Sequence, residues 1–377
     1  MSSALTDLFP HPIVQAPMAG GVSVPQLAAA VAEAGGLGFL AAGYKTADGM
    51  YQEIKQLRSL TGRPFGVNLF MPQPECPGTG PGSSGAAGAA LPAAGAVEVY
   101  AHQLAGEAAW YDTELGDPDS GRDDGYDAKF AVLLDNPVPV VSFHFGVPAA
   151  DALESLRRAG TVTLVTATTA EEAVAVERAG ADAVIVQGVE AGGHQGAHRD
   201  NPESDGCGNG LLSLIAQVRE SVRLPIVAAG GLMRGSQIAA VLAAGASAAQ
   251  LGTAFLATPE SGAHAVHKQA LTNPLFVRTE LTRAFSGRPA RALVNRFLRE
   301  HGPYAPAAYP EVHHLTAPLR KAAAKAGDAQ GMALWAGQGH RMARELPAGQ
   351  LVEVLLAELA DARTALSRFP AGDGGLS

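Results

Sequence analysis

The sequence contains little cysteine, few charged residues and no long apolar run. Among its 377 residues only Cys76 and Cys207 are cysteines, too few for a disulfide framework or a cysteine-based zinc site. Charged residues make up 17% of the chain, and the formal net charge of -9 leaves no excess of Lys and Arg for a nucleic-acid partner. Apolar runs such as 226–229 are far shorter than the ~20 residues that cross a bilayer, and the first residues do not resemble a secretory signal. We therefore expect a cytoplasmic protein in a reducing compartment, without a nucleic-acid or membrane partner.

One junction recurs along the chain: an Ala-rich amphipathic stretch, then Ala-Gly, then a short apolar run. A glycine just past a helix supplies the left-handed residue that ends it, and the apolar run beyond is typical of a strand buried on both faces. Alternating helices and buried strands indicate a parallel sheet. The junction occurs at Ala34-Gly35, Ala159-Gly160, Ala179-Gly180 and Ala244-Gly245.

Eight apolar runs have the length and spacing of strands in such a sheet. The predicted strands are 13–16, 37–40, 65–69, 139–143, 163–166, 183–187, 226–229 and 248–251. Helices are predicted at 24–34, 47–60, 149–158, 170–179, 211–221, 235–243 and 261–271. Eight strand-helix units over ~260 residues predict an α/β protein with a (β/α)8 TIM barrel. An open doubly wound sheet is the alternative.

Two regions fall outside this repeat. Residues 72–128 are expected to form an insertion after the third strand. This segment has a Pro/Gly-rich beginning, a helical patch at 97–110 and an acidic loop. It is either a lid over the barrel mouth or a surface insertion. The repeat stops near residue 272, so residues 1–272 are expected to form the barrel. Residues 273–377 are expected to form a mostly helical C-terminal cap that packs on the barrel and ends in an amphipathic stretch at 351–369.

Polar residues and glycines gather at the predicted carboxyl ends of the strands, where barrels build their active sites. Gly230-Gly231 and Gly252-Thr253 follow the seventh and eighth strands, the ends that commonly hold a phosphate group with backbone N–H groups. Glycine lets the backbone approach an anion without a Cβ in the way, although Gly230-Gly231 alone could simply form a tight turn. The Walker and dinucleotide-binding glycine motifs are both absent. The pattern therefore predicts a phosphate-bearing ligand at this rim.

Two histidines follow predicted strands. His194 lies within the Gly-rich segment 191–196, which we expect to be a flexible loop, and an imidazole held over a ligand there can take or share a proton. A solvated side chain is the alternative for His194. His144 ends a strand between two phenylalanines, which favours a hydrogen-bonded histidine that lines the site.

Other residues that often carry chemistry give weaker signals. Cys207 is flanked by glycines, as some nucleophilic cysteines are, but no activating base is adjacent in the sequence. The pairs His264 with His267 and His313 with His314 lack a carboxylate or cysteine to complete a metal site. We expect these four to be surface histidines and the protein to bind no metal.

Seven segments together resemble the nitronate monooxygenases, once called 2-nitropropane dioxygenases, and look most like class I of that family. They are QAPM at 15–18, GVNLF at 66–70, SFHFG at 142–146, QGVEAGGH at 187–194, AAGG at 228–231, QLGTAF at 250–255 and WAGQG at 335–339. Singly, the segments are shared with flavin-dependent enoyl-acyl-carrier-protein reductases and barrel NADH:quinone reductases. The resemblance implies a (β/α)8 barrel that holds non-covalent FMN and oxidises alkyl nitronates with dioxygen to a carbonyl product and nitrite.

The resemblance also implies roles for individual residues. His194 matches the catalytic histidine and would remove the α-proton if neutral nitroalkanes are used, and His144 and Tyr309 are expected to contact the substrate. The expected cofactor-binding residues are Ala16, Pro17, Met18, Asn68, Gln187, Gly192, Gly193, Gly230, Gly231, Gln250, Gly252 and Thr253. The chain departs from the family where His313 and Ala317 stand in place of a tyrosine and a lysine.

The expected partners are a small-molecule nitronate, dioxygen and a second copy of the chain in a homodimer. The alternative functions are an NADH-dependent flavin reductase of quinones or enoyl thioesters and a flavin-binding protein without catalytic activity.

Overall fold

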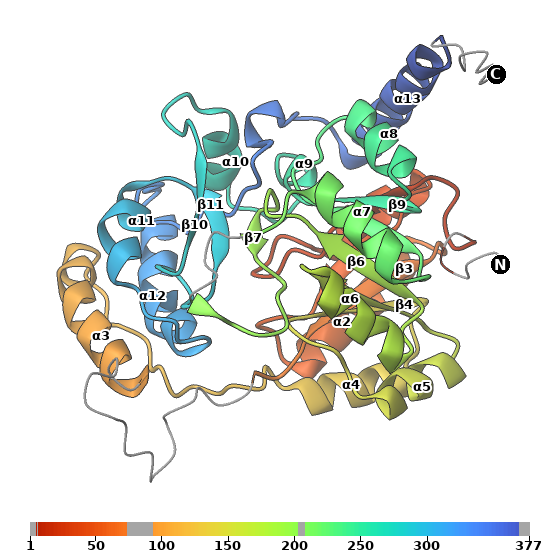
Figure 1. The fold of residues 1–377 in the computed structure, drawn as a ribbon. Helices are drawn as coiled ribbons and strands as arrows, with labels where there is room; N and C mark the ends of the chain where they lie inside the picture. The colour runs from red at the N-terminus through yellow and green to blue at the C-terminus, as the bar shows by residue number, and fades with distance from the viewer. Residues whose placement is uncertain (1–4, 6, 74–92, 203–207, 369–377) are drawn as a thin grey trace, which may run out of the picture.

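Eight parallel strands follow one another around a barrel in the structure, a computed structural model that describes residues 5, 7–73, 93–202 and 208–368 (Figure 1). The sheet runs in the order β1-β9-β8-β6-β5-β4-β3-β2, and a parallel bridge between Val14 and Leu37 joins its two ends. The strands are β1 (Ile13–Gln15), β2 (Gly38–Ala41), β3 (Phe65–Phe70), β4 (Val140–His144), β5 (Val162–Ala167), β6 (Ala183–Gln187), β8 (Ile226–Ala229) and β9 (Ala248–Leu251). The predicted TIM barrel is confirmed, and the open doubly wound alternative is wrong.

Apolar side chains on both faces of the strands build the core. One cluster fills the barrel interior with residues such as Phe39 and Leu164, while a second packs the outer faces of the strands against the helices. Gly66 on β3 makes room for this interior, because a Cβ there would lie 2.2 Å from the Phe39 ring. The continuous apolar runs in the sequence are therefore explained by burial on both faces.

The helices around the barrel end as the Ala-Gly junctions predict. Gly35, Gly160, Gly180 and Gly245 all have positive φ, between +83° and +105°. The helices that follow barrel strands are α1 (Pro25–Glu33), α2 (Ala47–Leu60), α5 (Ala150–Arg158), α6 (Ala170–Ala179), α7 (Leu211–Ser221) and α8 (Gly235–Ala243). After β9 the short α9 (Thr253–Leu256) precedes α10 (Ala265–Thr272), which begins later than predicted. His264 caps this helix, because its Nδ1 accepts a hydrogen bond from the Val266 N–H at 3.3 Å.

The described part of the insertion divides between the two halves of the molecule. The helix α4 (Tyr126–Asp135), which the sequence analysis did not predict, packs beside α2 on the outside of the barrel. In contrast, α3 (Ala93–Trp110) joins the C-terminal half, where the Tyr100 hydroxyl donates to the Ala284 carbonyl at 2.8 Å. Figure 1 shows α3 at the outer edge of that half, so this helix does not form a lid over the barrel mouth. Residues 74–92 lie outside the described part of the chain.

The C-terminal half contains a small sheet as well as helices. Its strands are β10 (Thr279–Thr282) and β11 (Ala290–Leu293), and its main helices are α11 (Arg296–His301), α12 (Glu311–Lys325) and α13 (Ala348–Ser367). Antiparallel pairing extends β10-β11 to β7 (Gly193–His194), which follows β6 of the barrel. The expected flexible loop at 191–196 therefore contains a paired strand. The helix α13 packs on α8 and α1 of the barrel, and Phe369, the predicted end of that helix, lies outside the described residues.

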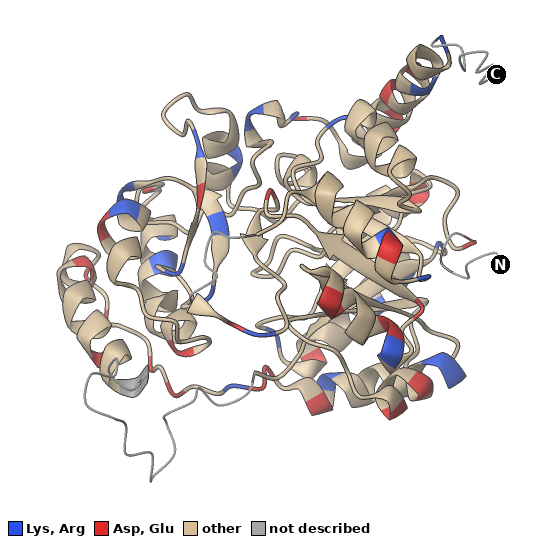
Figure 2. Ribbon diagram, viewed as in Figure 1, with Lys and Arg blue, Asp and Glu red and all other residues tan. Residues whose placement is uncertain are grey.

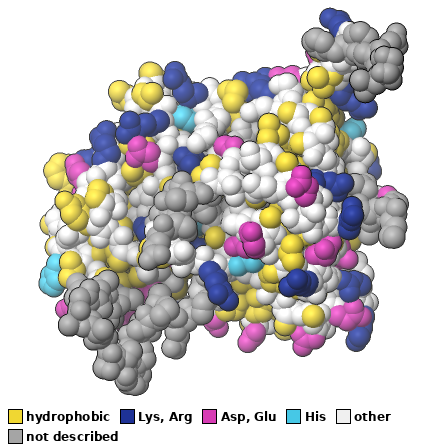
Figure 3. Space-filling view, in the orientation of Figure 1, with side chains coloured by type: hydrophobic (Ala, Val, Ile, Leu, Met, Phe, Trp, Pro, Cys, Tyr) yellow, Lys and Arg dark blue, Asp and Glu magenta, His cyan; other side chains and the backbone are white. Residues whose placement is uncertain are grey.

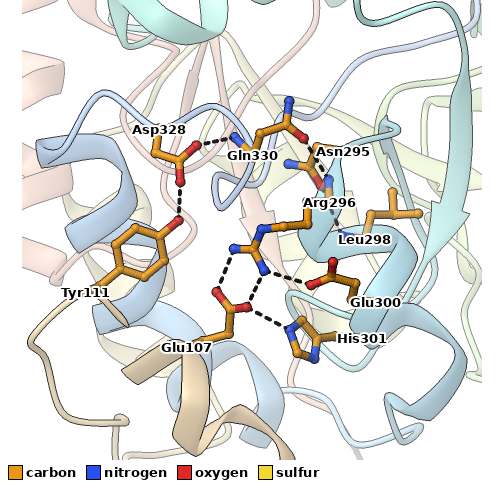
Figure 4. A network of polar contacts seen from close by, with 9 residues as sticks. All are labelled: Glu107, Tyr111, Asn295, Arg296, Leu298, Glu300, His301, Asp328 and Gln330. Atoms are coloured by element: carbon orange, nitrogen blue, oxygen red, sulfur yellow. Dashed lines mark hydrogen bonds and ion pairs between the residues drawn. The ribbon is translucent and has the colours of Figure 1, made fainter. Parts of the chain in front are cut away.

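An ion-pair network joins α3 to α11 (Figure 4). Arg296 donates to both carboxylate oxygens of Glu107 and to Glu300 at 2.8 Å, and His301 Nε2 lies 3.2 Å from Glu107. Hydrogen bonds from Arg296 lower the pKa of Glu107. Glu107, Glu300 and His301 are close enough together to share a metal ion, but the Arg296 guanidinium already forms ion pairs with both carboxylates. The cluster thus anchors the insertion to the C-terminal half.

Charges of both signs are interspersed on the helices around the barrel and over the described atoms of the face shown (Figures 2 and 3). Among the described residues, no helix is both long and apolar enough to cross a membrane.

Candidate active site

A cavity of about 440 Å³ lies at the carboxyl ends of the barrel strands. Its lining includes both predicted histidines of the strand ends, His144 and His194. It also includes every predicted cofactor-binding residue: Ala16, Pro17, Met18, Asn68, Gln187, Gly192, Gly193, Gly230, Gly231, Gln250, Gly252 and Thr253. Tyr309 is buried behind this lining, with its ring centroid 5.7 Å from that of His194.

The glycines at the cavity have different local reasons to be glycine. Gly230 and Gly231 have φ of +136° and +67°, a conformation that side chains rarely adopt. Gly252 has an ordinary φ of -103°, and an added Cβ would lie 3.5 Å from Ala16 Cβ, in normal contact. Gly192 is required by packing, because a Cβ there would lie 2.4 Å from the backbone nitrogen of Gly337.

The amide side chains at the strand ends are partly engaged by the protein itself. Gln187 holds the segment after β6, since its Nε2 donates to the His194 carbonyl at 3.1 Å and its Oε1 accepts from the Gly196 N–H at 2.7 Å. Asn68 Nδ2 donates to Ser142 Oγ at 2.9 Å. Gln250 differs, because its Oε1 is buried and has no hydrogen-bond partner in the described chain. Gln250 therefore presents an acceptor that a ligand donor could satisfy.

His194 is held by the C-terminal half of the molecule. It pairs with Ala290 across β7 and β11, and its Nε2 lies 2.9 Å from Ser286 Oγ. Burial, together with the charges of Arg288 and Arg320 and the proximity of His144, lowers the pKa of His194 to about 3. The imidazole is therefore neutral at pH 7.

His144 fits the expected role of a hydrogen-bonded lining residue. Its Nδ1 lies 3.2 Å from Thr166 Oγ1, and burial together with the Arg288 charge lowers its pKa to about 3. His144 and His194, the two histidines at the strand ends, thus stay uncharged at neutral pH.

An aromatic cluster, formed by Tyr44, Phe70, Phe145 and Tyr309, covers one side of His194. Tyr44 and Phe145 adopt positive φ, which costs ~1–3 kcal/mol at each residue and is maintained by the surrounding structure. The Tyr44 N–H donates to Asp124 at 2.8 Å, so the insertion helps to fix this backbone. The Tyr44 and Tyr309 hydroxyls are 3.2 Å apart.

Two arginines that the sequence analysis missed approach the site from the C-terminal half. The Arg288 side chain is only 1% exposed, and its guanidinium carbon lies 4.1 Å from the centre of the Phe145 ring. Arg320 lies on α12 and lines the cavity. No sequence motif surrounds Arg288. Arg320, however, belongs to a spaced series in the sequence. Ala317 follows His313 by four residues and Arg320 follows Ala317 by three, a spacing that places all three on one face of a helix.

A second cavity of about 330 Å³ adjoins the first, and His194, Arg320 and Trp335 line both. His313 also lines it and stacks on Tyr44 at 3.9 Å between ring centroids. The expectation of a surface histidine is thus wrong for His313.

The remaining histidines and Cys207 complete the comparison with the sequence. His267 is buried, with Nε2 3.0 Å from the Trp335 carbonyl oxygen, so the surface expectation is wrong here too. His264 is exposed as expected. Cys207, the weak candidate nucleophile, lies outside the described residues.

Comparisons with known proteins identify relatives along nearly the whole chain. The family model described as nitronate monooxygenase matches residues 2–358. A nitronate monooxygenase of Pseudomonas aeruginosa is 42% identical, over 94% of this chain and 99% of its own. A solved structure of a nitroalkane oxidase from Streptomyces ansochromogenes is 81% identical, covers 97% of this chain and all of its own, and has a TM-score of 0.92. FabK from Thermotoga maritima is 29% identical, over 97% and 98% of the two chains, with a TM-score of 0.71.

The family match agrees with the barrel and with the strand-end segments that suggested it. The chain belongs to the nitronate monooxygenase family.

Proposed function

We propose that this protein is an FMN-dependent nitronate monooxygenase that oxidises alkyl nitronates with dioxygen to a carbonyl compound and nitrite. The observation that carries the proposal is a single cavity that joins a glycine-lined rim to a neutral histidine, His194, and to the guanidinium of Arg320. The names of the relatives from Pseudomonas aeruginosa and Streptomyces ansochromogenes support the same chemistry.

The residues of the rim fit a flavin phosphate and ring. Gly231 and Gly252 offer backbone N–H groups without side chains in front of them, at the strand ends where barrels commonly bind phosphate. The unpartnered Gln250 Oε1 suits a ring N–H donor. When bound, FMN would accept electrons from the nitronate and pass them to dioxygen.

The protein's own residues would position the substrate and move its proton. The Ser286 hydroxyl lies 3.2 Å from the Arg288 carbonyl and can donate its one hydrogen there. His194 Nε2 then carries the ring hydrogen and donates to Ser286 Oγ, so Nδ1 holds the free lone pair. We infer that Nδ1 of His194 accepts the α-proton of a neutral nitroalkane, while the aromatic cluster excludes water from this side.

We further propose a division of roles along the chain. The barrel, residues 1–272, would hold the cofactor, and residues 273–377 would supply the side chains that surround the substrate. The homodimer and the cytoplasmic location remain predictions.

The absorption spectrum of the purified protein and the identity of its released cofactor test the proposal. We expect a flavin spectrum, release of FMN rather than FAD on denaturation, bleaching by an anaerobic nitronate and nitrite formation in air. Rapid anaerobic bleaching by NADH, with none by the nitronate, would support the reductase alternative instead. A colourless protein that cannot be reconstituted with FMN would refute both the cofactor and the function.

A further inference from the structure

Arg320 occupies the boundary between the two cavities at the active site. It lies on α12, one face of which also carries His313 and Ala317, and it lines both cavities together with His194 and Trp335. Ala317 also lines the second cavity, and its small side chain does not block the Arg320 guanidinium from that cavity.

The protein fixes one side of this guanidinium and leaves the other available. Nε donates to Thr316 Oγ1 at 3.1 Å, and Nη2 donates to the His313 carbonyl at 2.9 Å. Nη2 also lies 3.3 Å from His313 Nδ1. For Nη1, the described part of the chain provides no hydrogen-bond partner. Since the residue lines both cavities, Nη1 is the donor that a bound molecule can reach.

The charge of Arg320 is also uncompensated. Its hydrogen-bond partners are all uncharged, and no carboxylate of the described residues lies within 4.0 Å of its nitrogens. Arg320 is half-buried, and a cation with restricted access to water is usually paired with an anion or stabilised by several hydrogen bonds. Burial lowers the pKa of Arg320, in keeping with a charge that has no protein anion beside it. Since His194, His144 and His313 are neutral, the positive charges beside the two cavities come from Arg320, from Arg288 behind Phe145 and from Lys321, an exposed residue at the second cavity.

We propose that Arg320 binds an anionic oxygen of the substrate's nitronate group through Nη1 and thereby determines the preference for nitronates over neutral nitroalkanes. The proposal rests on the proposed function and adds a residue that sequence motifs did not indicate. A purely structural role for Arg320, that of holding His313 against Tyr44, is the alternative, and it predicts no difference between charged and uncharged substrates.

A nitronate and its neutral nitroalkane distinguish an anion-binding role of Arg320 from a purely structural one, because the two substrates become negatively charged at different stages of the reaction. A nitronate is charged when it binds, so losing Arg320 raises its KM by at least about tenfold, the scale of one hydrogen bond to a charged group. A neutral nitroalkane acquires charge only as its proton leaves, so its KM changes by less than about threefold while its kcat falls.

The test uses the cofactor-loaded protein and the variants Arg320→Gln, Arg320→Lys and Lys325→Met. The last is a matched control that removes an exposed positive charge from the same helix. Each protein is assayed with a nitroalkane and its own nitronate, and nitrite is titrated by calorimetry as a non-reacting anion with the same pair of oxygens on nitrogen. Thermal melting verifies that each variant folds.

We expect Arg320→Gln to weaken nitrite binding and to raise the nitronate KM by at least about tenfold, with a smaller effect for Arg320→Lys and none for Lys325→Met. Nitrite affinity and nitronate KM within about threefold of the parent in Arg320→Gln would overturn the proposal. If Arg320→Gln does not fold, Arg320→Lys decides, and equal KM changes for nitronate and nitroalkane in that variant would overturn it. A parent that binds nitrite through Arg320 but does not oxidise nitronates would refute the proposed function and leave the anion site standing.

Discussion

The substitution Gly252→Val tests the cofactor rim with little disturbance of the fold. Gly252 has a φ of -103°, which other residues adopt, and the nearest atoms to an added Cβ are Ala16 Cβ at 3.5 Å and Met18 Sδ at 3.7 Å. Both distances are ordinary van der Waals contacts, so the first added carbon fits. The two methyl groups of valine would extend beyond it into the cavity, where we place the phosphate.

The expected loss of affinity follows from that geometry. Crowding added methyl groups into an occupied site costs ~1–3 kcal/mol, which corresponds to a dissociation constant for FMN about 5- to 150-fold higher. Gly252→Ala, which adds only the fitting Cβ, should give a smaller effect. The melting temperature of the cofactor-free protein should change by no more than about 2 °C, because the new contacts with the protein are unstrained.

Fluorescence titration of the cofactor-free protein with FMN measures the dissociation constant, and thermal melting measures the fold. The matched control is Gly106→Val, since Gly106 is exposed on α3 with no atom within 4 Å of an added Cβ. If Gly252→Val and Gly106→Val bind FMN within twofold of the parent, the phosphate does not lie at Gly252 and the reasoning is wrong.

His194→Asn should lower kcat on a neutral nitroalkane by ~100-fold or more but lower kcat on the corresponding nitronate less. Equal losses of kcat on both substrates, each normalised to bound flavin, would exclude the role of base. Because the neutral imidazole is the reactive form and its pKa is lowered to about 3, kcat/KM for the nitroalkane should show no histidine inflection between pH 5 and 8; an inflection near 6.5 would contradict the buried environment. Glu107→Gln should lower the melting temperature at pH 7 by a few degrees. Because the folded pKa of Glu107 lies below its usual value of 4.5, this stabilisation is present above pH 4.5 and should decrease as the pH falls through the folded pKa; a difference between the variant and the parent that does not decrease on acidification would argue against the ion pair. Gly192→Ala should destabilise the fold by ~1–3 kcal/mol through the clash with Gly337, and a variant that melts like the parent but loses FMN would instead make Gly192 a cofactor contact.

The barrel could be predicted from the sequence because its signals are local. Each Ala-Gly junction marks the end of a helix and, within a few residues, the start of a buried strand. Because the carboxyl ends of parallel strands lie at the same end of a barrel, the polar residues that follow the strands are expected at one rim. The cavity lining around Gly231, Gly252 and Gln250 follows directly from that repeat. The chemical identity of the ligand does not, and flavin entered only through resemblance to a family.

The small sheet could not be predicted in the same way. The strands β10 and β11 are four residues each, and β7 has two, so none has room for a periodic pattern. Their pairing joins Ala290 to His194, far apart in the sequence, and is decided by tertiary packing. The Gly-rich composition of 191–196 suggested mobility, whereas Gly192 is required by the approach of Gly337.

Arg288 and Arg320 were missed for a related reason. An arginine is usually a surface residue, and only the folded chain shows that Arg288 is covered by Phe145 and that Arg320 reaches a cavity. His313 and His267 show the same limit, since no neighbouring residue in the sequence signals their burial.

The pairing of β7 with β11 also determines when, during synthesis of the chain, the active site can be completed. The chain is made from its N-terminus, so all eight barrel strands are complete before Ser286 and Ala290 are added. Until then, His194 has neither its strand partner nor the hydroxyl that orients its ring. A nascent chain can therefore form the cradle for its cofactor before its base is aligned, and the reactive geometry is among the last features of the molecule to be assembled.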